Sequence, residues 1–270
     1  MTQYTYILST GRTGTQFLAL YFDQNYPNVA ALHEPKPSYR LHIMANAYVA
    51  GKVPRPLALA LFQRWRKALI GRYSDKDHFI ESNNFLYGLI DLMPELVSDP
   101  VIIHIVRDPR EFVRSTINYG AWYGYKWFAS KFVPYWFADL REHLHPYKNP
   151  SVAARFAAQW AHVNLALQKG GNGNPGYRCL KFEDIFKPPY EGLRHICDIL
   201  GLAYCDGKDG LSPEEIKNPS RYNFIGSWPS WTAQECRELQ EICGPLMAQY
   251  GYGGEPEWLE KLGEKSAPLP

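Results

Sequence analysis

The sequence predicts an α/β fold: a single domain with a mostly parallel central sheet flanked by helices. Two observations predict it. Short β-prone runs alternate with helix-prone segments along the chain, which is the pattern of a parallel sheet covered by helices. The run Val101–Val106 is also continuous and β-branched, as strands buried on both faces of a sheet are. With 270 residues, we expect one domain over residues 1–255 and a polar tail over residues 256–270.

The first half of the chain begins with a β-prone run, Tyr4–Ser9, that ends in a Thr10-Gly11 turn. Apolar residues in Thr15–Asp23 fit a helix packed on a sheet. Pro109 can begin a helix, with Glu111 in the first turn. The other elements expected in this half are strands at Val29–Leu32, His78–Ser82 and Val101–Val106 and a helix at Leu57–Ile70.

The second half of the chain continues the alternation. Ser151–Lys169 is alanine-rich, with Ser151 as a candidate N-cap, and predicts a helix. We also expect a strand at Tyr177–Phe182, a helix at Tyr190–Leu200 that Gly201 ends, and a last helix at Thr232–Tyr250.

Composition excludes several classes of protein. The formal net charge is +2, from 29 basic and 27 acidic residues, so we expect no nucleic-acid partner. No run of about 18 apolar residues predicts a transmembrane helix, and the N-terminus lacks the pattern of a secretory signal. The five cysteines include no C-x-x-C pair, so we expect free thiols, no metal site and a cytoplasmic location.

The loop after the first strand is the strongest functional signal. In Ser9-Thr10-Gly11-Arg12-Thr13-Gly14-Thr15-Gln16, glycines allow a tight turn that aims backbone N–H groups and a helix N-terminus at one anion. Arg12 adds a positive fork suited to phosphate or sulfate, and the threonines add hydroxyl donors. The loop resembles a P-loop without the Gly-Lys-Ser/Thr ending, so the expected fold is P-loop-NTPase-like. A purely structural glycine turn is the alternative.

A second anion site is predicted after the strand Val101–Val106. Arg107 follows that strand directly, and ligands of open α/β sheets bind outside the carboxyl ends of the strands. Ser115, two helical turns later, can face the same crevice and help to hold a phosphate. The alternative is that Arg107 is a surface partner of Asp108 or Glu111.

Together these motifs resemble those of sulfotransferases that use 3′-phosphoadenosine 5′-phosphosulfate (PAPS), in particular the bacterial and Golgi-type branch. Arg12-Thr13-Gly14-Thr15 is similar to the loop that holds the 5′-phosphosulfate in that family. Arg107-Asp108-Pro109 with Ser115 is similar to the 3′-phosphate motif. Further similar segments are Leu180–Ile185, Cys197–Leu202, Gly226-Ser227-Trp228 and Ile242–Met247. The chain departs from the cytosolic members at Arg12, where they have lysine, and at Phe182, which stands for a tyrosine.

The resemblance implies a PAPS cofactor, with 3′-phosphoadenosine 5′-phosphate (PAP) as product, and no metal. It implies that Arg12, Thr13, Gly14, Thr15, Gln16, Arg107, Ser115, Ser227 and Trp228 bind the cofactor and that Arg12 also serves the leaving phosphate. Sulfuryl transfer needs a general base within reach of the acceptor hydroxyl. His33 and Glu34, after the second strand, are the candidate bases, with Glu81 in reserve; a His-Glu-Pro turn bonded only to backbone is the alternative.

The acceptor is not specified by the sequence: it is a hydroxyl of a small molecule, a lipid or a carbohydrate, and the oligomeric state is equally open. Ten aromatic residues within 119–137 either wall an acceptor pocket or pack on the core. The basic run Lys52–Arg72 either guides an anionic substrate or is a solvated helix face. The alternative functions are a P-loop-type nucleotide-dependent kinase and a non-catalytic nucleotide-binding protein.

Overall fold

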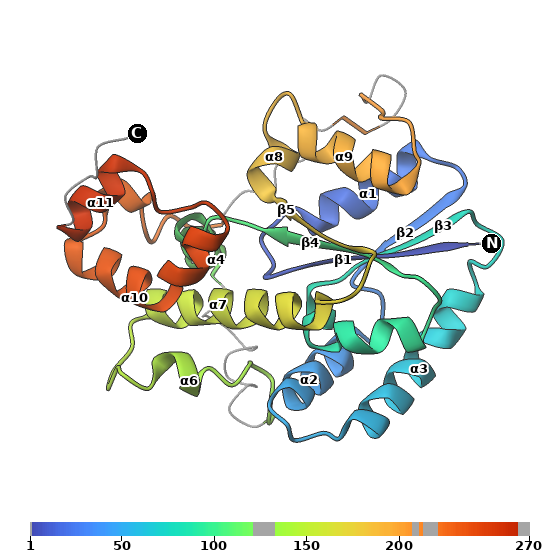
Figure 1. The fold of residues 1–270 in the computed structure, drawn as a ribbon, viewed down its shortest axis with the longest axis horizontal. Helices are drawn as coiled ribbons and strands as arrows, with labels where there is room; N and C mark the ends of the chain where they lie inside the picture. The colour runs from blue at the N-terminus through green and yellow to red at the C-terminus, as the bar shows by residue number, and fades with distance from the viewer. Residues whose placement is uncertain (1, 121–132, 207–210, 213–220, 264–270) are drawn as a thin grey trace. The chain divides into compact units, whose positions relative to one another are not determined.

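The computed structural model describes residues 2–120, 133–206, 211–212 and 221–263. It confirms the α/β fold class, because five strands form one all-parallel sheet in the order β2-β3-β1-β4-β5 (Figure 1). The strands are β1 (Gln3–Ser9), β2 (Val29–His33), β3 (His78–Ser82), β4 (Val101–Val106) and β5 (Tyr177–Lys181).

The strand register brings three chain segments to one edge of the sheet. Ser82 at the end of β3 pairs with Ile7 of β1 and with His33 at the end of β2, and Ser9 of β1 pairs with Ile105 of β4. Since all strands are parallel, the loops that follow β1, β2 and β3 leave from the same edge. This edge is the one at which open α/β sheets bind their ligands.

The chain divides into two compact units. The first comprises residues 1–106, 133–138 and 163–218 and contains the whole sheet. In Figure 1, α1 (Thr15–Asn25), α8 (Phe182–Phe186) and α9 (Glu191–Leu200) cover one face of this sheet. The other face is covered by α2 (Ser38–Val49), α3 (Arg55–Gly71), the 3-10 helix η1 (Asn84–Glu95) and the end of α7 (Val152–Gly171).

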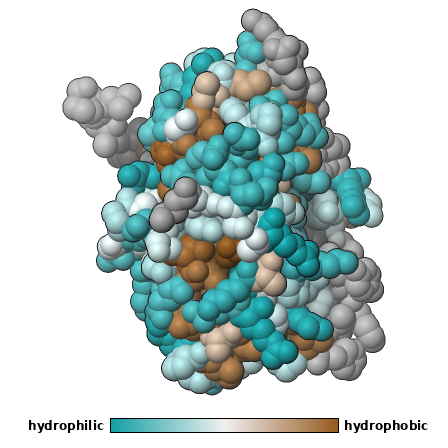
Figure 2. All heavy atoms as spheres, turned by 90° about the vertical axis from the view of Figure 1, so that its right-hand side faces the viewer, coloured by the Kyte–Doolittle hydropathy of each residue, from teal (hydrophilic) through white to brown (hydrophobic). Residues whose placement is uncertain are grey.

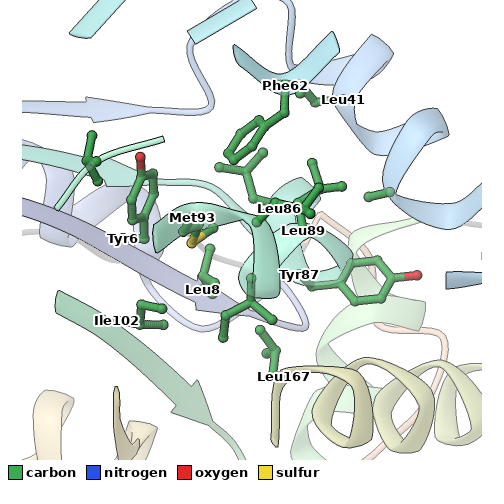
Figure 3. Packing of buried hydrophobic residues seen from close by; sticks show 14 of the residues in the cluster. Tyr6, Leu8, Leu41, Phe62, Leu86, Tyr87, Leu89, Met93, Ile102 and Leu167 are labelled. Carbon is green, nitrogen blue, oxygen red and sulfur yellow. The ribbon is translucent and has the colours of Figure 1, made fainter. Parts of the chain in front are cut away.

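A hydrophobic core fills the space between the sheet and the second helical layer. Tyr6 and Leu8 of β1 are fully buried there, as is Ile102 of β4. Figure 3 shows Leu86, Leu89 and Met93 of η1 between these strands and the outer residues Leu41 and Phe62. The long apolar 3-10 helix therefore acts as the inner filling of this face, which explains why it is buried along most of its length.

The second unit comprises residues 107–132, 139–162 and 219–270. Its described elements are α4 (Pro109–Tyr119), α6 (Arg141–Leu144), the beginning of α7, the 3-10 helix η2 (Trp228–Ser230), α10 (Ala233–Gln249) and α11 (Pro256–Leu262). Thr232 caps α10 through a reciprocal pair of hydrogen bonds with Glu235.

Most expected elements lie within a few residues of their expected bounds, and β3 and β4 have the same bounds. Six described elements lie where no element is predicted, apart from the first residue of α8: α2, η1, α6, α8, η2 and α11. Residues 256–262, part of the expected tail, form α11, whose Trp258 is fully buried. The proposed domain boundary at residue 255 stays a prediction.

The surface is mixed in character. On the face drawn in Figure 2, hydrophobic side chains form separate patches between hydrophilic ones. Within the described residues, no helix combines the length and apolar character needed to cross a bilayer.

Candidate functional site

The loop between β1 and α1 is folded as a cradle. Gly11 (φ +85°), Arg12 (φ +56°) and Gly14 (φ +68°) all adopt the left-handed conformation, which turns the backbone sharply. The Ser9 hydroxyl accepts a hydrogen bond from the Gly11 N–H at 3.0 Å and another from the Thr13 hydroxyl at 2.5 Å. The predicted turn therefore exists, and internal hydrogen bonds fix its shape.

The N-terminus of α1 opens from this cradle without a competing negative charge. Gly14 is the N-cap, no side chain caps the first turn, and that turn contains no acidic residue. Unpaired N–H groups and the helix dipole together favour an anion at such an end. Thr15 is buried and Gln16 is exposed beside it.

Gly14 also meets a steric demand. A Cβ at this position would lie 2.2 Å from Cζ of Phe186, a residue of α8. Phe186 packs on Phe182 and, edge to face, on Phe17 of α1. Helix α8, which follows β5, thus packs against the loop, and a glycine is required at position 14 both for its φ and for its size.

Asn84 connects the loop to the candidate base. Its Oδ1 accepts a hydrogen bond from the Ser9 hydroxyl at 2.6 Å. Its Nδ2 lies 3.5 Å from Oγ1 of Thr15 and 3.4 Å from Oε1 of Glu34. One amide side chain therefore holds the anion loop and the Glu34 carboxylate next to each other. Asn84 is not among the predicted site residues; the sequence signal for it is its position two residues after a strand that ends at the ligand edge.

His33 and Glu34 lie together at the end of β2. His33 Nε2 is 3.9 Å from Glu34 Oε1, and both side chains are about a quarter exposed, at 28% and 27%. Burial lowers the pKa of His33, although a hydrogen bond that the ring donates to the backbone of Ser82 opposes the shift. His33 is therefore neutral near pH 7. Glu34 has a left-handed backbone (φ +44°), which is strained for a residue with a side chain.

Glu81, the reserve base, lies elsewhere. Its side chain is fully buried and forms an ion pair with Arg66 at 2.8 Å. Burial raises the pKa of Glu81, while the Arg66 charge opposes this shift. A carboxylate enclosed in this way has no route to an acceptor, so the structure places Glu81 in a supporting position. Arg66 belongs to the basic run Lys52–Arg72, and in this respect the run is not a uniformly solvated helix face.

The second predicted motif begins α4 in the second unit. The Arg107 carbonyl accepts a hydrogen bond from Nε1 of Trp160 at 2.8 Å, and Asp108 caps α4 by accepting from the N–H of Arg110. Ser115 lies two turns along α4 and is buried. The carboxylates considered as alternative partners of Arg107 are engaged by other arginines: Asp108 by Arg110 and Glu111 by Arg114, each at 2.6 Å.

Arg110 is a hub that the sequence did not reveal. Its guanidinium bonds to both oxygens of Asp108 and to both oxygens of Glu255. Its carbon Cζ lies 4.8 Å from the ring centroid of Trp228 and 5.0 Å from that of Trp258. Trp228 is half-buried and packs against Arg110 and Trp258, whereas Ser227 is exposed. Binding of the cofactor by Ser227 and Trp228 stays a prediction.

The aromatic segment 119–137 is only partly described, because residues 121–132 lie outside the described part of the chain. Tyr119, in the second unit, lies under Arg221. Trp136, in the first unit, stacks on Tyr39 with centroids 5.7 Å apart. At these two places the aromatic residues make packing contacts.

Potential metal ligands and thiols are spread through the described part of the chain. Among those that the structure describes, no three His, Cys, Asp or Glu side chains gather as metal ligands would. The five cysteines are free, and three of them, Cys197, Cys236 and Cys243, are buried.

Comparison with known proteins adds information at the level of the fold. No family model matches the chain, and no curated protein matches it. Its structure is similar to a sulfotransferase domain from the curacin biosynthetic pathway, with a TM-score of 0.50, 13% identity, and coverage of 100% of this chain and 99% of that one. A sulfotransferase from Alicyclobacillus acidocaldarius gives a TM-score of 0.50 and 13% identity over 97% of this chain and 96% of that one. The chain therefore has the sulfotransferase fold.

Proposed function

We propose that this protein is a sulfotransferase that transfers a sulfuryl group from PAPS to a hydroxyl of a small molecule, a lipid or a carbohydrate. The observation that carries the proposal is the contact of Asn84 with both Thr15 and Glu34. It sets a carboxylate beside an anion cradle, in a chain with the sulfotransferase fold. A purely structural glycine turn does not require a carboxylate at that point.

In this proposal the donor is held at its two charged ends. Arg12, Thr13, Gly14, Thr15 and Gln16 bind the 5′-phosphosulfate, through backbone N–H groups and the positive end of α1. Arg107 and Ser115 bind the 3′-phosphate. Support comes from chain order, because Arg107 is bonded to the last residue of β4 and β4 pairs with β1.

The reaction is an in-line displacement at sulfur. The acceptor oxygen forms a bond to sulfur while the bond between sulfur and the 5′-phosphate oxygen breaks, and PAP leaves with the electron pair. Arg12 and the loop N–H groups stabilise the charge that develops on the leaving phosphate. The acceptor proton goes to Glu34, which Asn84 orients, and neutral His33 beside it helps to direct the hydroxyl.

The donor site is tested by calorimetry with PAP in a buffer that contains a chelator. We expect binding, and we expect Arg107→Ala to weaken it by about 10- to 100-fold, the magnitude of a lost charge-assisted contact. Arg114→Ala is the matched control, since Arg114 lies on the same helix and pairs with Glu111. Equal affinity in Arg107→Ala and the control would remove the 3′-phosphate assignment.

Transfer is tested with PAPS labelled in its sulfate and with lipid, carbohydrate and small-molecule fractions of a cell extract. We expect one labelled product, and we expect Glu34→Gln to lower its formation by about 100-fold or more while PAP affinity is unchanged. A labelled fraction then identifies the acceptor by mass spectrometry. If PAPS binds and no fraction becomes labelled, the protein is a nucleotide-binding protein without transferase activity.

A further inference from the structure

Arg66 and Glu81 form an ion pair in the interior of the first unit. Both side chains have no exposed surface, and their closest atoms, Nη2 and Oε1, are 2.8 Å apart. Within the described residues, Nε of Arg66 and Oε2 of Glu81 are buried without a hydrogen-bond partner. A buried pair with unfilled hydrogen bonds is an inefficient way to stabilise a fold, because apolar residues of similar volume often do it as well. A contribution to the stability of the fold therefore does not by itself account for the Arg66–Glu81 pair.

The guanidinium of Arg66 reaches the chain directly after Glu34. Its Nη2 donates to the carbonyl of Pro35 at 3.1 Å, and its Nη1 donates to the carbonyl of Lys36 at 3.2 Å. These are the first and second carbonyls that follow the Glu34 residue. Arg66 therefore fixes the exit of the loop, and the Glu34 N–H, bonded to the Ser82 carbonyl at 3.0 Å, fixes its entry.

Glu81 also bonds to the residue before Asn84, whose side-chain amide contacts Glu34. Its Oε1 accepts a second hydrogen bond, from Nδ2 of Asn83 at 2.7 Å. Asn83 in turn accepts a hydrogen bond from the N–H of Phe85 and so caps the helix that begins with Asn84. One carboxylate oxygen is thus bonded both to Arg66, which holds the chain after Glu34, and to Asn83, which precedes the Asn84 that contacts the Glu34 side chain.

The backbone of Glu34 explains why such support is needed. A glutamate at φ +44° lies in a region that side chains disfavour, and strained backbone persists only where the surroundings hold it. The carbonyls held by Arg66 are those that would move if Glu34 relaxed to an ordinary conformation. On this basis, and resting on the proposed function, we propose that Arg66 and Glu81 are positioning residues that hold the Glu34 carboxylate at the acceptor hydroxyl.

The principal test is the double variant Arg66→Met/Glu81→Met, which removes both charges at similar volume. We expect it to fold, to bind PAP as the wild type does, and to lose about tenfold in kcat with the acceptor fraction identified above, because Glu34 is misplaced. Combined with Glu34→Gln, it should cause no further loss, since both changes act through one carboxylate. Arg64→Met, an exposed arginine on α3, is the matched control and should keep the wild-type kcat.

A second measurement does not depend on turnover. Amide hydrogen exchange of residues 33–40 should be faster in the double variant and unchanged in Arg64→Met, because the Pro35 and Lys36 carbonyls lose their anchor. If the double variant does not fold, Arg66→Lys replaces it: lysine keeps the charge but cannot span both carbonyls and the carboxylate. It should show the same exchange and the same loss of kcat.

The outcomes separate the two proposals. If Glu34→Gln is impaired while a folded Arg66/Glu81 variant has wild-type kcat and exchange, the positioning role is wrong and the proposed function stands. If the losses in kcat from the Arg66/Glu81 variant and from Glu34→Gln multiply, the pair acts by a general effect on the fold and not through Glu34. If Glu34→Gln itself has wild-type turnover, the assignment of Glu34 as the base fails, and the positioning role of Arg66 and Glu81 fails with it.

Discussion

Two buried arginines, Arg66 in the first unit and Arg110 in the second, are used in different ways. Each has almost no exposed side-chain surface and each bonds to a carboxylate. Arg110 makes two-pronged contacts with Asp108 and with Glu255, and its guanidinium also lies over the rings of Trp228 and Trp258. Arg66 donates to one oxygen of Glu81, which also accepts from Asn83. Its other hydrogen bonds go to the carbonyls of Pro35 and Lys36.

The difference indicates what each arginine contributes. Burial lowers the pKa of Arg110, but the hydrogen bonds from its guanidinium to Glu255 and Asp108 outweigh burial and raise it. Arg110 therefore joins the start of α4 to η2 and to the start of α11 by filled contacts, which is the role of an anchor. For Arg66 the contacts are fewer and point at a loop, so its contribution is to geometry rather than to stability.

The largest expected effect comes from removing the anchor. Arg110→Met leaves the Asp108 and Glu255 carboxylates facing each other in a partly buried place, so we expect a loss of about 3 kcal/mol or more in the free energy of unfolding. The control is Arg141→Met, whose exposed pair with Asp139 should contribute less than about 1 kcal/mol. Urea unfolding followed by tryptophan fluorescence measures both. An Arg110 variant as stable as the control would break the comparison.

The second prediction is that the two glutamate partners respond oppositely to pH. The hydrogen bond from Arg110 lowers the pKa of Glu255, so its stabilisation is present above the unfolded pKa near 4.5 and is lost as the pH falls through the folded value. Burial raises the pKa of Glu81 against the opposing charge of Arg66, so Glu81 takes up a proton more readily in the fold than in the unfolded chain, and stability linked to Glu81 is lost as the pH rises above 4.5.

Unfolding of Glu255→Gln and Glu81→Gln between pH 3 and pH 8 measures this difference. Relative to the wild type, Glu255→Gln should be most destabilised at neutral pH and should approach wild-type stability in acid. Glu81→Gln should compare most favourably with the wild type at neutral pH and least favourably in acid. Parallel curves for the two variants would show that both carboxylates have the same environment.

The same two regions show how far the sequence alone leads. Strand β4 and the cradle at Gly11–Thr15 were predictable because they rest on local patterns: a β-branched run, glycine turns and the residues that follow a strand. The expected general-base pair, His33 and Glu34, also follows from its place after a strand. These features are decided by residues close together in the chain.

The parts that could not be predicted depend on contacts between distant residues. Arg66 lies in a run of basic residues with the composition of a solvated surface, and its partners Pro35 and Glu81 are far from it in the chain. Glu255 bonds to a side chain 145 residues earlier. Residues 256–262 are polar enough to be taken for a tail, yet Trp258 is buried against Trp228 and Arg110, which no local pattern specifies.

The smallest expected effect concerns Trp228, for which packing and cofactor binding are separable. Trp228→Phe keeps an aromatic face over Arg110 but reduces its area and its electrostatic attraction, so we expect a loss of about 1 kcal/mol in stability. Measured beside it, the Kd for PAP decides which role the ring has. An unchanged Kd would show that Trp228 only packs on Arg110. A Kd that is several-fold higher, measured under conditions in which the variant is fully folded, would show that the Trp228 ring also contacts the nucleotide. In that case the two arginines would be alike in one respect, since Arg110 would position Trp228 for the nucleotide as Arg66 is proposed to position Glu34 for the acceptor.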